Sequence, residues 1–290
     1  MRDYVIMTDS CCDMTAKMAA ELDLEVMPLS LQLEGQSFQN YLDGRDIAFG
    51  DFYARIRAGS QSTTSAVSVG DFEARMREVL VSGRDVLCIN FSSALSTTYQ
   101  SAAIAADDLR SEFPEAKLLV VDSLCASLGL GLLLFLCAQE KKLGRTIDEV
   151  HTFAQMTRGH ICHWFTVDDL NHLKRGGRIS AATALFGTML AIKPVMHVDN
   201  GGHLTPVGKV RGRKSSLVAL VDHMQETAID PGRQTVFISH GDCEGDALFV
   251  AEEIRRRFGT EAIFVNYVGP VIGSHSGPGT VALFFLGEKR

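Results

Sequence analysis

The chain has 290 residues, of which 46% are apolar and 22% are charged, and its formal net charge is −7. A chain of this size and composition buries a large core, which excludes intrinsic disorder, a collagen-like structure and a small disulfide-rich scaffold. The negative net charge disfavours a nucleic-acid-binding protein, because such proteins are usually basic. We therefore expect a globular protein of about two domains with no nucleic-acid partner.

In four places a short apolar, β-branched run ends in small polar residues and is followed by a helical pattern. These runs occupy residues 4–7, 85–91, 117–121 and 234–239. Strands without polar alternation, each followed by a helix, predict a mostly parallel sheet covered by helices on both faces. The hydroxyl residues after the strands are natural helix caps, and they gather where open α/β sheets bind ligands.

The middle of the chain follows a different pattern. A short helix ends at Gly176-Gly177, and an apolar helix is predicted at about 181–190. Residues 193–214 then predict a β-hairpin, because Asn200-Gly201-Gly202 is a strong turn signal. We place a domain boundary near residue 160.

The fold class is therefore α/β with two domains. Residues 1–160 form an α/β domain around a mostly parallel sheet, and residues 161–290 form an α/β domain around a mixed sheet that includes the hairpin. Residues 280–290 could join either domain.

Residues 174–214 carry eight cations and one anion, so this stretch is basic within an acidic chain. Period-two alternation on the second hairpin strand would place Lys209, Arg211 and Arg213 on one face. A basic face suggests contact with an anionic partner, and a solvated hairpin face explains the pattern equally well.

The seven cysteines include no C-x-x-C pair, and the first residues lack the apolar core of a signal peptide. Both features predict a cytoplasmic protein with reduced thiols. The longest uncharged apolar stretch, Leu124–Ala138, is shorter than the roughly 20 residues that span a bilayer. We expect no stable membrane insertion, and a helix that is buried in a core or lines a cavity.

The signatures of nucleotide and metal sites are incomplete. Val210 stands where a P-loop requires Ser or Thr, and the glycine spacing before it is one residue too long. His160, Cys162 and His163 cannot easily converge on a metal, because neighbouring strand residues face opposite sides. We expect neither a metal nor a cofactor.

Three segments rich in Ser, Thr and Gly, at 63–72, 91–102 and 269–280, would separately be helix caps and turns. Together with a G-G-R motif they resemble the DegV family of fatty-acid-binding proteins, over essentially the whole chain and in order. The matching motifs are T-S-A-V-S-V-G-D-F (64–72), S-S-A-L-S-T-T-Y (92–99), L-K-R-G-G-R-I (173–179) and G-S-H-S-G-P-G-T (273–280). The chain departs from the family at Ala66-Val67, where the family has Gln-Pro, and at Thr97, where it has Gly.

The resemblance implies that one long-chain fatty acid, such as palmitate, binds in a tunnel of the first domain with its carboxylate near the domain interface. The family's carboxylate ligands correspond to Thr64, Ser96 and His275, and the cationic partner to Arg178, with Arg175 as the alternative. Two hydroxyls and an imidazole can donate three hydrogen bonds to a carboxylate. At about 0.8 kcal/mol for each buried methylene, about fourteen methylenes contribute roughly 11 kcal/mol before the costs of ordering.

The resemblance also implies a role. Some members present the bound acid to an ATP-dependent fatty acid kinase, which phosphorylates the carboxylate. The chain would then be a carrier in fatty acid metabolism or lipid transport and not an enzyme, with Arg211 as the preferred contact for the kinase. The alternative function is a hydrolase or acyltransferase that uses Ser96 with His275, although no G-x-S-x-G elbow surrounds a serine.

Overall fold

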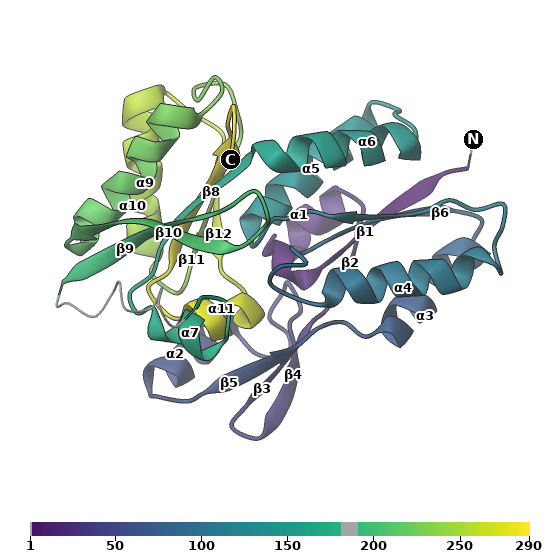
Figure 1. Ribbon diagram of the computed structural model, residues 1–290, viewed down its shortest axis with the longest axis horizontal. Coiled ribbons are helices and arrows are strands. Elements are labelled where there is room, and N and C mark those ends of the chain that lie inside the picture. Colours follow the sequence, from purple (N-terminus) through teal and green to yellow (C-terminus); the bar gives the residue numbers. More distant parts are fainter. Residues whose placement is uncertain (1, 181–190) are drawn as a thin grey trace.

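The computed structural model describes residues 2–180 and 191–290, so the apolar helix predicted at 181–190 lies outside the described residues. Figure 1 shows two halves side by side, each built around its own large sheet, with a small third sheet beneath the first half. The predicted fold class, α/β with one mostly parallel and one mixed sheet, is confirmed. In the described part of the chain, no helix combines the length and apolarity needed to cross a membrane.

The first large sheet has four parallel strands in the order β2-β1-β6-β7. Its central strands are buried along their whole length, as expected where helices cover both faces. The strands are β1 (Tyr4–Asp9), β2 (Leu24–Met27), β6 (Asp85–Asn90) and β7 (Leu118–Asp122). The helices of this half are η1 (Ser10–Cys12), α1 (Ala16–Glu21), α3 (Val69–Val81), α4 (Thr98–Arg110) and α6 (Ile147–Thr157).

A three-stranded antiparallel sheet, in the order β4-β3-β5, was not predicted from the sequence. It consists of β3 (Ser30–Leu33), β4 (Gln36–Gln39) and β5 (Ser62–Ser65), and α2 (Phe49–Arg57) lies between β4 and β5 in the chain. Glu34 and Gly35, both with positive φ, form the turn between β3 and β4. Each strand has only four residues, so its hydrophobic pattern is too short to detect.

The second large sheet has six strands in the order β10-β9-β8-β13-β11-β12, and only β11 and β12 are parallel. The strands are β8 (Ile161–Thr166), β9 (Ile192–Val198), β10 (Leu204–Arg211), β11 (Val236–His240), β12 (Ile263–Tyr267) and β13 (Val281–Leu286). The predicted hairpin is therefore β9–β10. Residues 280–290, which could have joined either domain, belong to this sheet: β13 lies between β8 and β11 in its middle.

The helices of the second half are η2 (Arg158–His160), α7 (Asn171–Arg175), α9 (Arg213–Thr227), α10 (Glu244–Phe258) and α11 (Pro270–Ser276). In Figure 1, α9 and α10 cover the outer side of the second half, whereas α7 and α11 lie below its sheet, and α11 contacts α2, β3 and β5. The first residues of two family motifs lie in these short helices, 173–175 in α7 and 273–276 in α11.

Helix α5 (Leu128–Lys142) joins the two halves. It contacts β8, β11 and β13 of the second half, and Phe135 packs against Phe237 with ring centroids 5.9 Å apart. A helix that is apolar on all sides is stable only where it is buried on all sides. The predicted apolar stretch at 124–138 is therefore mainly a core helix, and the main hydrophobic core extends across both halves.

Candidate functional site

A cavity of about 440 Å³ lies between the two halves, a volume typical of sites for small molecules. Its wall includes all four residues that the family resemblance assigns to the carboxylate, which are Thr64, Ser96, Arg178 and His275. They come from β5, the β6–α4 loop, the segment after α7 and α11. The structure thus brings four distant segments to one cavity, and their role towards a carboxylate stays a prediction.

Thr64 and His275 are in direct contact. The Thr64 Oγ1 and His275 Nε2 atoms are 2.8 Å apart, although the residues are 211 positions apart in the chain. Pro270 starts α11 at a position where its fixed φ suits a helix, and Gly277, with a φ of 77°, ends the helix directly after the motif. These two residues determine where the short helix begins and ends, and the helix places His275 against the small sheet.

The imidazole of His275 is neutral at physiological pH. Its burial and the neighbouring Arg178 lower its pKa to about 4. The Nδ1 atom is buried without a hydrogen-bond partner and lies against Gly176, where a Cβ would fall 2.1 Å from it. The first glycine of the G-G-R motif is therefore explained by the close approach of this ring.

Arg178 is half-buried, and its guanidinium is held by backbone carbonyls. Its Nε and Nη2 atoms donate to the Leu95 oxygen at 3.1 and 3.0 Å, and Nη1 donates to the Gly176 oxygen. A guanidinium has five N–H donors, so two remain for a ligand. Arg175, the alternative cation, does not line this cavity.

Ser96 lies in a loop that is anchored at both ends. Asp9 Oδ2 accepts a hydrogen bond from Phe91 N at 2.9 Å, and Ser96 Oγ lies 2.8 Å from Thr98 Oγ1. Thr97, which replaces a family glycine, has a φ of −77°, so the backbone does not require glycine there.

The hydrolase alternative finds no support in this geometry. A serine nucleophile needs a hydrogen bond from its hydroxyl to the base. The Nε2 atom of His275 contacts Thr64 and its Nδ1 atom has no partner, so within the described residues no bond joins it to Ser96. A pKa of about 4 also makes His275 a weak base at neutral pH.

The rest of the wall is mainly apolar and comes from both halves. The first half contributes Leu29, Phe91 and Leu95, and the second half contributes Phe165, Leu173, Val198, Leu204, Val271, Ile272 and Phe284. Strands β8, β11 and β13 close the other side of this cavity, and a tunnel that continues within the first domain stays a prediction. Only the residues just before α5, Ala126 and Ser127, reach the cavity from the predicted apolar stretch.

Sequence reasoning missed a buried acidic group behind this wall. Asp13 Oδ2 accepts a hydrogen bond from Ser127 Oγ at 2.6 Å, and Ser127 Oγ lies 2.9 Å from Ser239 Oγ. Burial raises the pKa of Asp13 to about 7, although hydrogen bonds from Ser127 and the Gly269 N–H oppose the shift. The position of Asp13, an acidic residue just after the turn that follows β1, could have indicated from the sequence that it lies near the site. No sequence feature indicated the same for Ser127.

His163, considered above as a metal-like residue, also lines the cavity. Its Nε2 accepts from Ala126 N at 3.1 Å, so its Nδ1 donates to the Ile161 oxygen at 2.9 Å. Burial lowers the pKa of His163 well below its usual value, and the ring is a neutral structural link between the halves. Within residues 2–180 and 191–290, no group of three or more His, Cys, Asp or Glu residues could hold a metal ion.

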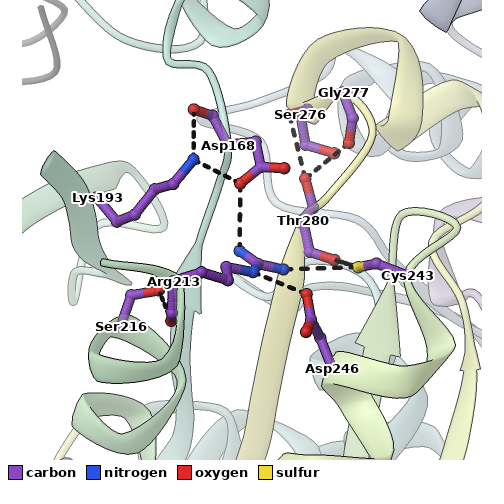
Figure 2. A network of polar contacts seen from close by, with 9 residues as sticks. All are labelled: Asp168, Lys193, Arg213, Ser216, Cys243, Asp246, Ser276, Gly277 and Thr280. Atoms are coloured by element: carbon purple, nitrogen blue, oxygen red, sulfur yellow. Dashed lines mark hydrogen bonds and ion pairs between the residues drawn. The ribbon is translucent and has the colours of Figure 1, made fainter. Parts of the chain in front are cut away.

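The expectation of one basic face on the second hairpin strand is wrong for Arg213. Strand β10 ends at Arg211, and Arg213 is the first residue of α9. Figure 2 shows its guanidinium turned inwards, where Nε pairs with Asp246 at 2.8 Å and Nη1 lies 3.7 Å from Asp168. Lys209 and Arg211 remain exposed on β10.

The comparisons with known proteins cover the full length of the chain. A family model described as "Uncharacterised protein, DegV family" matches residues 3–288. A DegV domain-containing protein of Clostridium perfringens is 40% identical over 290 residues, covering 100% of this chain and 99% of the relative.

Two solved structures have the same fold. A DegV family protein from Thermus thermophilus, studied for fatty acid binding, is 30% identical with a TM-score of 0.87, covering 99% of this chain and 100% of that chain. The fatty acid kinase B3 protein of Streptococcus pneumoniae, loaded with linoleic acid, has a TM-score of 0.86 with the same coverage. At 19% identity, this second likeness shows the fold alone. The family model and the Clostridium relative span this sequence almost from end to end, and the chain belongs to the DegV family.

Proposed function

We propose that the protein binds one long-chain fatty acid, such as palmitate, with its tail in the cavity and its carboxylate at Thr64, Ser96, Arg178 and His275. The observation that carries this proposal is the Thr64–His275 contact of 2.8 Å at the wall of a largely apolar cavity of about 440 Å³. The fatty acid binding studied in the Thermus thermophilus relative supports the same ligand class.

The neutral state of the His275 imidazole favours the binding of a carboxylate next to Thr64. A neutral imidazole that donates from Nε2 to Thr64 Oγ1 leaves the threonine hydroxyl proton free for the ligand. Likewise, Thr98 can donate to Ser96 Oγ, which frees the Ser96 proton. The two uncommitted N–H groups of Arg178 then supply charge-assisted hydrogen bonds.

Removal of either hydroxyl tests the assignment of the head group. In Thr64→Val and Ser96→Ala, we expect palmitate binding to weaken by about 1–3 kcal/mol, because a carboxylate oxygen loses its donor. Thr152→Val, on the exposed face of α6, is the matched control. Isothermal titration calorimetry after removal of co-purified lipid measures the change. Wild-type protein that binds no palmitate, and yields no fatty acid on extraction, would contradict the proposal.

We further propose that the chain is a cytoplasmic, non-catalytic carrier that presents the acid to an ATP-dependent fatty acid kinase. All seven cysteines are free thiols, which fits a reducing compartment. Arg211 is exposed on the edge strand β10, and within the described part of the chain no carboxylate pairs with it. It is therefore a suitable contact for an acidic surface of the kinase.

The docking role is tested with the ATP-hydrolysing subunit of a bacterial fatty acid kinase and palmitate-loaded carrier. We expect Arg211→Glu to reduce phosphate transfer from ATP to palmitate at least tenfold, because a like charge replaces an attractive contact. Arg233→Glu changes the same charge at an exposed position in the loop before β11 and should transfer at the wild-type rate. Equal rates for both variants would remove Arg211 from the interface.

A further inference from the structure

The wall of the cavity between the halves contains polar groups besides the proposed carboxylate ligands. Ser127, just before α5, and Ser239, on β11, both line the wall, and their Oγ atoms are 2.9 Å apart. Both residues are buried, and the buried carboxyl group of Asp13 lies behind them. An alkyl tail makes no use of hydroxyl groups, and polar groups are costly to bury against apolar atoms, so their presence in this wall requires a separate explanation.

Capping of the following helix does not explain Ser127. A serine at the N-cap position usually accepts a hydrogen bond from an N–H group of the first turn, but the Ser127 side chain makes no such bond to α5. Its Oγ atom instead donates to Asp13 Oδ2 at 2.6 Å. The backbone of Ser127, with φ of 53° and ψ of −142°, adopts a conformation that is rare for residues other than glycine. The chain thus keeps an unfavourable conformation at the residue whose hydroxyl is directed to Asp13 and Ser239.

The hydrogen bonds of these three side chains run in one direction. Because the only hydroxyl proton of Ser127 goes to Asp13, Ser239 donates its own proton to Ser127 Oγ, and its lone pairs remain for a donor on a ligand. The pKa of Asp13 is about 7, and when this carboxyl group is protonated the direction reverses and Ser239 offers its proton instead. A ligand hydroxyl fits both states because it donates and accepts, whereas a ketone only accepts.

A second hydroxyl on this wall also has capacity for a ligand. Ser276 lines the cavity, and among the described residues its buried Oγ atom has no hydrogen-bond partner. The hydroxyl of Thr280 donates to the backbone oxygens of Ser276 and Gly277, at 3.1 and 2.9 Å, and not to this side chain (Figure 2). Buried hydroxyls without a partner are uncommon, so this side of the cavity is suited to a polar group on the ligand.

Helix α11 indicates how far the Ser127–Ser239 pair lies from the proposed carboxylate ligands. Asp13 Oδ1 accepts a hydrogen bond from Gly269 N at 3.0 Å just before this helix, whereas His275 lies in its last turn. A rise of about 1.5 Å per residue separates Gly269 from His275 by about 9 Å. An extended alkyl chain advances by about 1.3 Å per carbon–carbon bond and covers this distance in roughly seven bonds. The serine pair therefore corresponds to the middle of a long tail and not to its methyl end.

We propose that the cavity accepts a long-chain fatty acid with a hydroxyl group near the middle of its tail, and that Ser239, positioned by Ser127 and Asp13, binds this hydroxyl. The inference rests on the proposed carboxylate site and specifies its substrate class. In a wholly apolar cavity the hydroxyl would lose its hydrogen bonds to water without compensation. Ser239 replaces one of these bonds, so the hydroxylated acid binds without the usual penalty for burying its hydroxyl.

The test compares 10-hydroxyoctadecanoate with octadecanoate by isothermal titration calorimetry on lipid-free protein. We expect the wild type to bind the two acids with affinities within about threefold of each other. Ser239→Ala should weaken binding of the hydroxy acid about tenfold and change octadecanoate binding by less than about twofold, because only the ligand hydroxyl loses its partner. Ser216→Ala is the matched control, since Ser216 is buried in α9 and does not line the cavity. Binding of 18-hydroxyoctadecanoate, with its hydroxyl at the end of the tail, should not respond to Ser239→Ala.

The outcomes separate this inference from the proposed function. Wild-type protein that binds octadecanoate, but binds the 10-hydroxy acid more than about tenfold more weakly, overturns the inference alone. Equal losses for both acids in Ser239→Ala would also overturn it, because the serine would then only support the shape of the cavity. Protein that binds neither acid overturns the carboxylate site itself. The comparison of the two acids in the wild type needs no variant, so it decides the matter even if Ser239→Ala does not fold.

Discussion

His275 lies against Gly176, and a Cβ atom built on that glycine would fall 2.1 Å from the imidazole Nδ1. In Gly176→Ala the ring must therefore move, and its contact with Thr64 Oγ1 is lost. We expect fatty acid affinity to fall at least tenfold while the protein stays folded, which calorimetry and thermal denaturation together measure. Gly159→Ala is the control, because a Cβ there meets open space. Unchanged affinity in Gly176→Ala would show that the ring position is unimportant.

The carboxyl group of Asp13 makes stability depend on pH. Burial raises its pKa from 3.8 to about 7 in the folded protein. Between these values the folded state holds a proton that the unfolded state releases, so this group's contribution to stability is lost as pH rises from about 4 through 7. His275, with a folded pKa of about 4, acts in the opposite direction below its usual pKa of 6.5.

Comparison with Asp13→Asn isolates the contribution of Asp13, because all other titrating groups are shared by the two proteins. We expect the free energy of unfolding of the wild type to fall relative to that of Asp13→Asn as pH rises from 5 to 8. Urea denaturation at four pH values measures the difference. Parallel curves for the two proteins would mean that Asp13 is ionised throughout this range.

The family motifs in the sequence predicted that Thr64, Ser96, Arg178 and His275 form one site. They did not predict which hydrogen bonds these residues make. Which of Thr64 and Ser96 contacts His275 depends on how β5 and α11 approach each other across the interface between the halves. The packing of that interface is not encoded in any local pattern. The Asp13–Ser127–Ser239 contacts were missed for the same reason, because their three segments meet only in the folded chain.

At the scale of elements, α7 and α11 pack through two reciprocal pairs. His275 of α11 lies on Gly176 after α7, and His172 of α7 lies on Gly277 after α11, where a Cβ would fall 2.6 Å from the ring. Each glycine makes room for the histidine of the other helix. The residues in and next to these two family motifs therefore determine how α7 packs against α11, although the motifs are 100 residues apart in the sequence.

The basic stretch shows what periodicity could and could not predict. Alternation placed the exposed Lys209 and Arg211 correctly, because it holds within β10. It failed at Arg213, because the chain turns into α9 at Gly212, whose φ is 93°. Gly212 allows this change from strand to helix because it adopts a positive φ. The amino-acid sequence shows that a glycine is present but not which φ it adopts.

Arg213 and Arg211 therefore offer a matched pair of variants. Arg213→Ala leaves Asp246 without its ion-pair partner, whereas Asp168 keeps its pair with Lys193. We expect the free energy of unfolding to fall by about 1–2 kcal/mol, since the network is only partly buried. Arg211→Ala should stay within about 0.5 kcal/mol of the wild type. Urea denaturation of both variants provides the comparison. Equal stability losses would contradict the assignment of Arg213 to an internal network.

At the scale of the whole molecule, the turn between β9 and β10 connects the halves next to the cavity. Ser92 Oγ of the first half donates to the Gly202 oxygen in that turn at 3.0 Å. Val198 and Leu204, which flank the turn, line the cavity wall. We therefore expect the rate of fatty acid release to depend on how firmly the turn is held against the first half.

Arg290 holds this turn in place. Its Nη1 atom donates to the oxygens of Leu124 at 2.6 Å and Asp199 at 3.2 Å, which belong to the first half and to the turn. Its Nε atom donates to the Ile161 oxygen at 3.0 Å at the start of β8. One guanidinium therefore links three segments that enclose the same cavity.

We expect Arg290→Ala to release palmitate several-fold faster than the wild type, because the turn loses one of its two polar connections to the first half and keeps only the Ser92–Gly202 hydrogen bond. Arg290→Lys should be intermediate, since an ammonium keeps the charge but cannot reproduce the fork of the guanidinium. Stopped-flow displacement of a fluorescent fatty acid measures the dissociation rate, with Lys289→Ala as the neighbouring control. A dissociation rate equal to that of Lys289→Ala would mean that the Ser92–Gly202 contact and apolar packing hold the turn without Arg290.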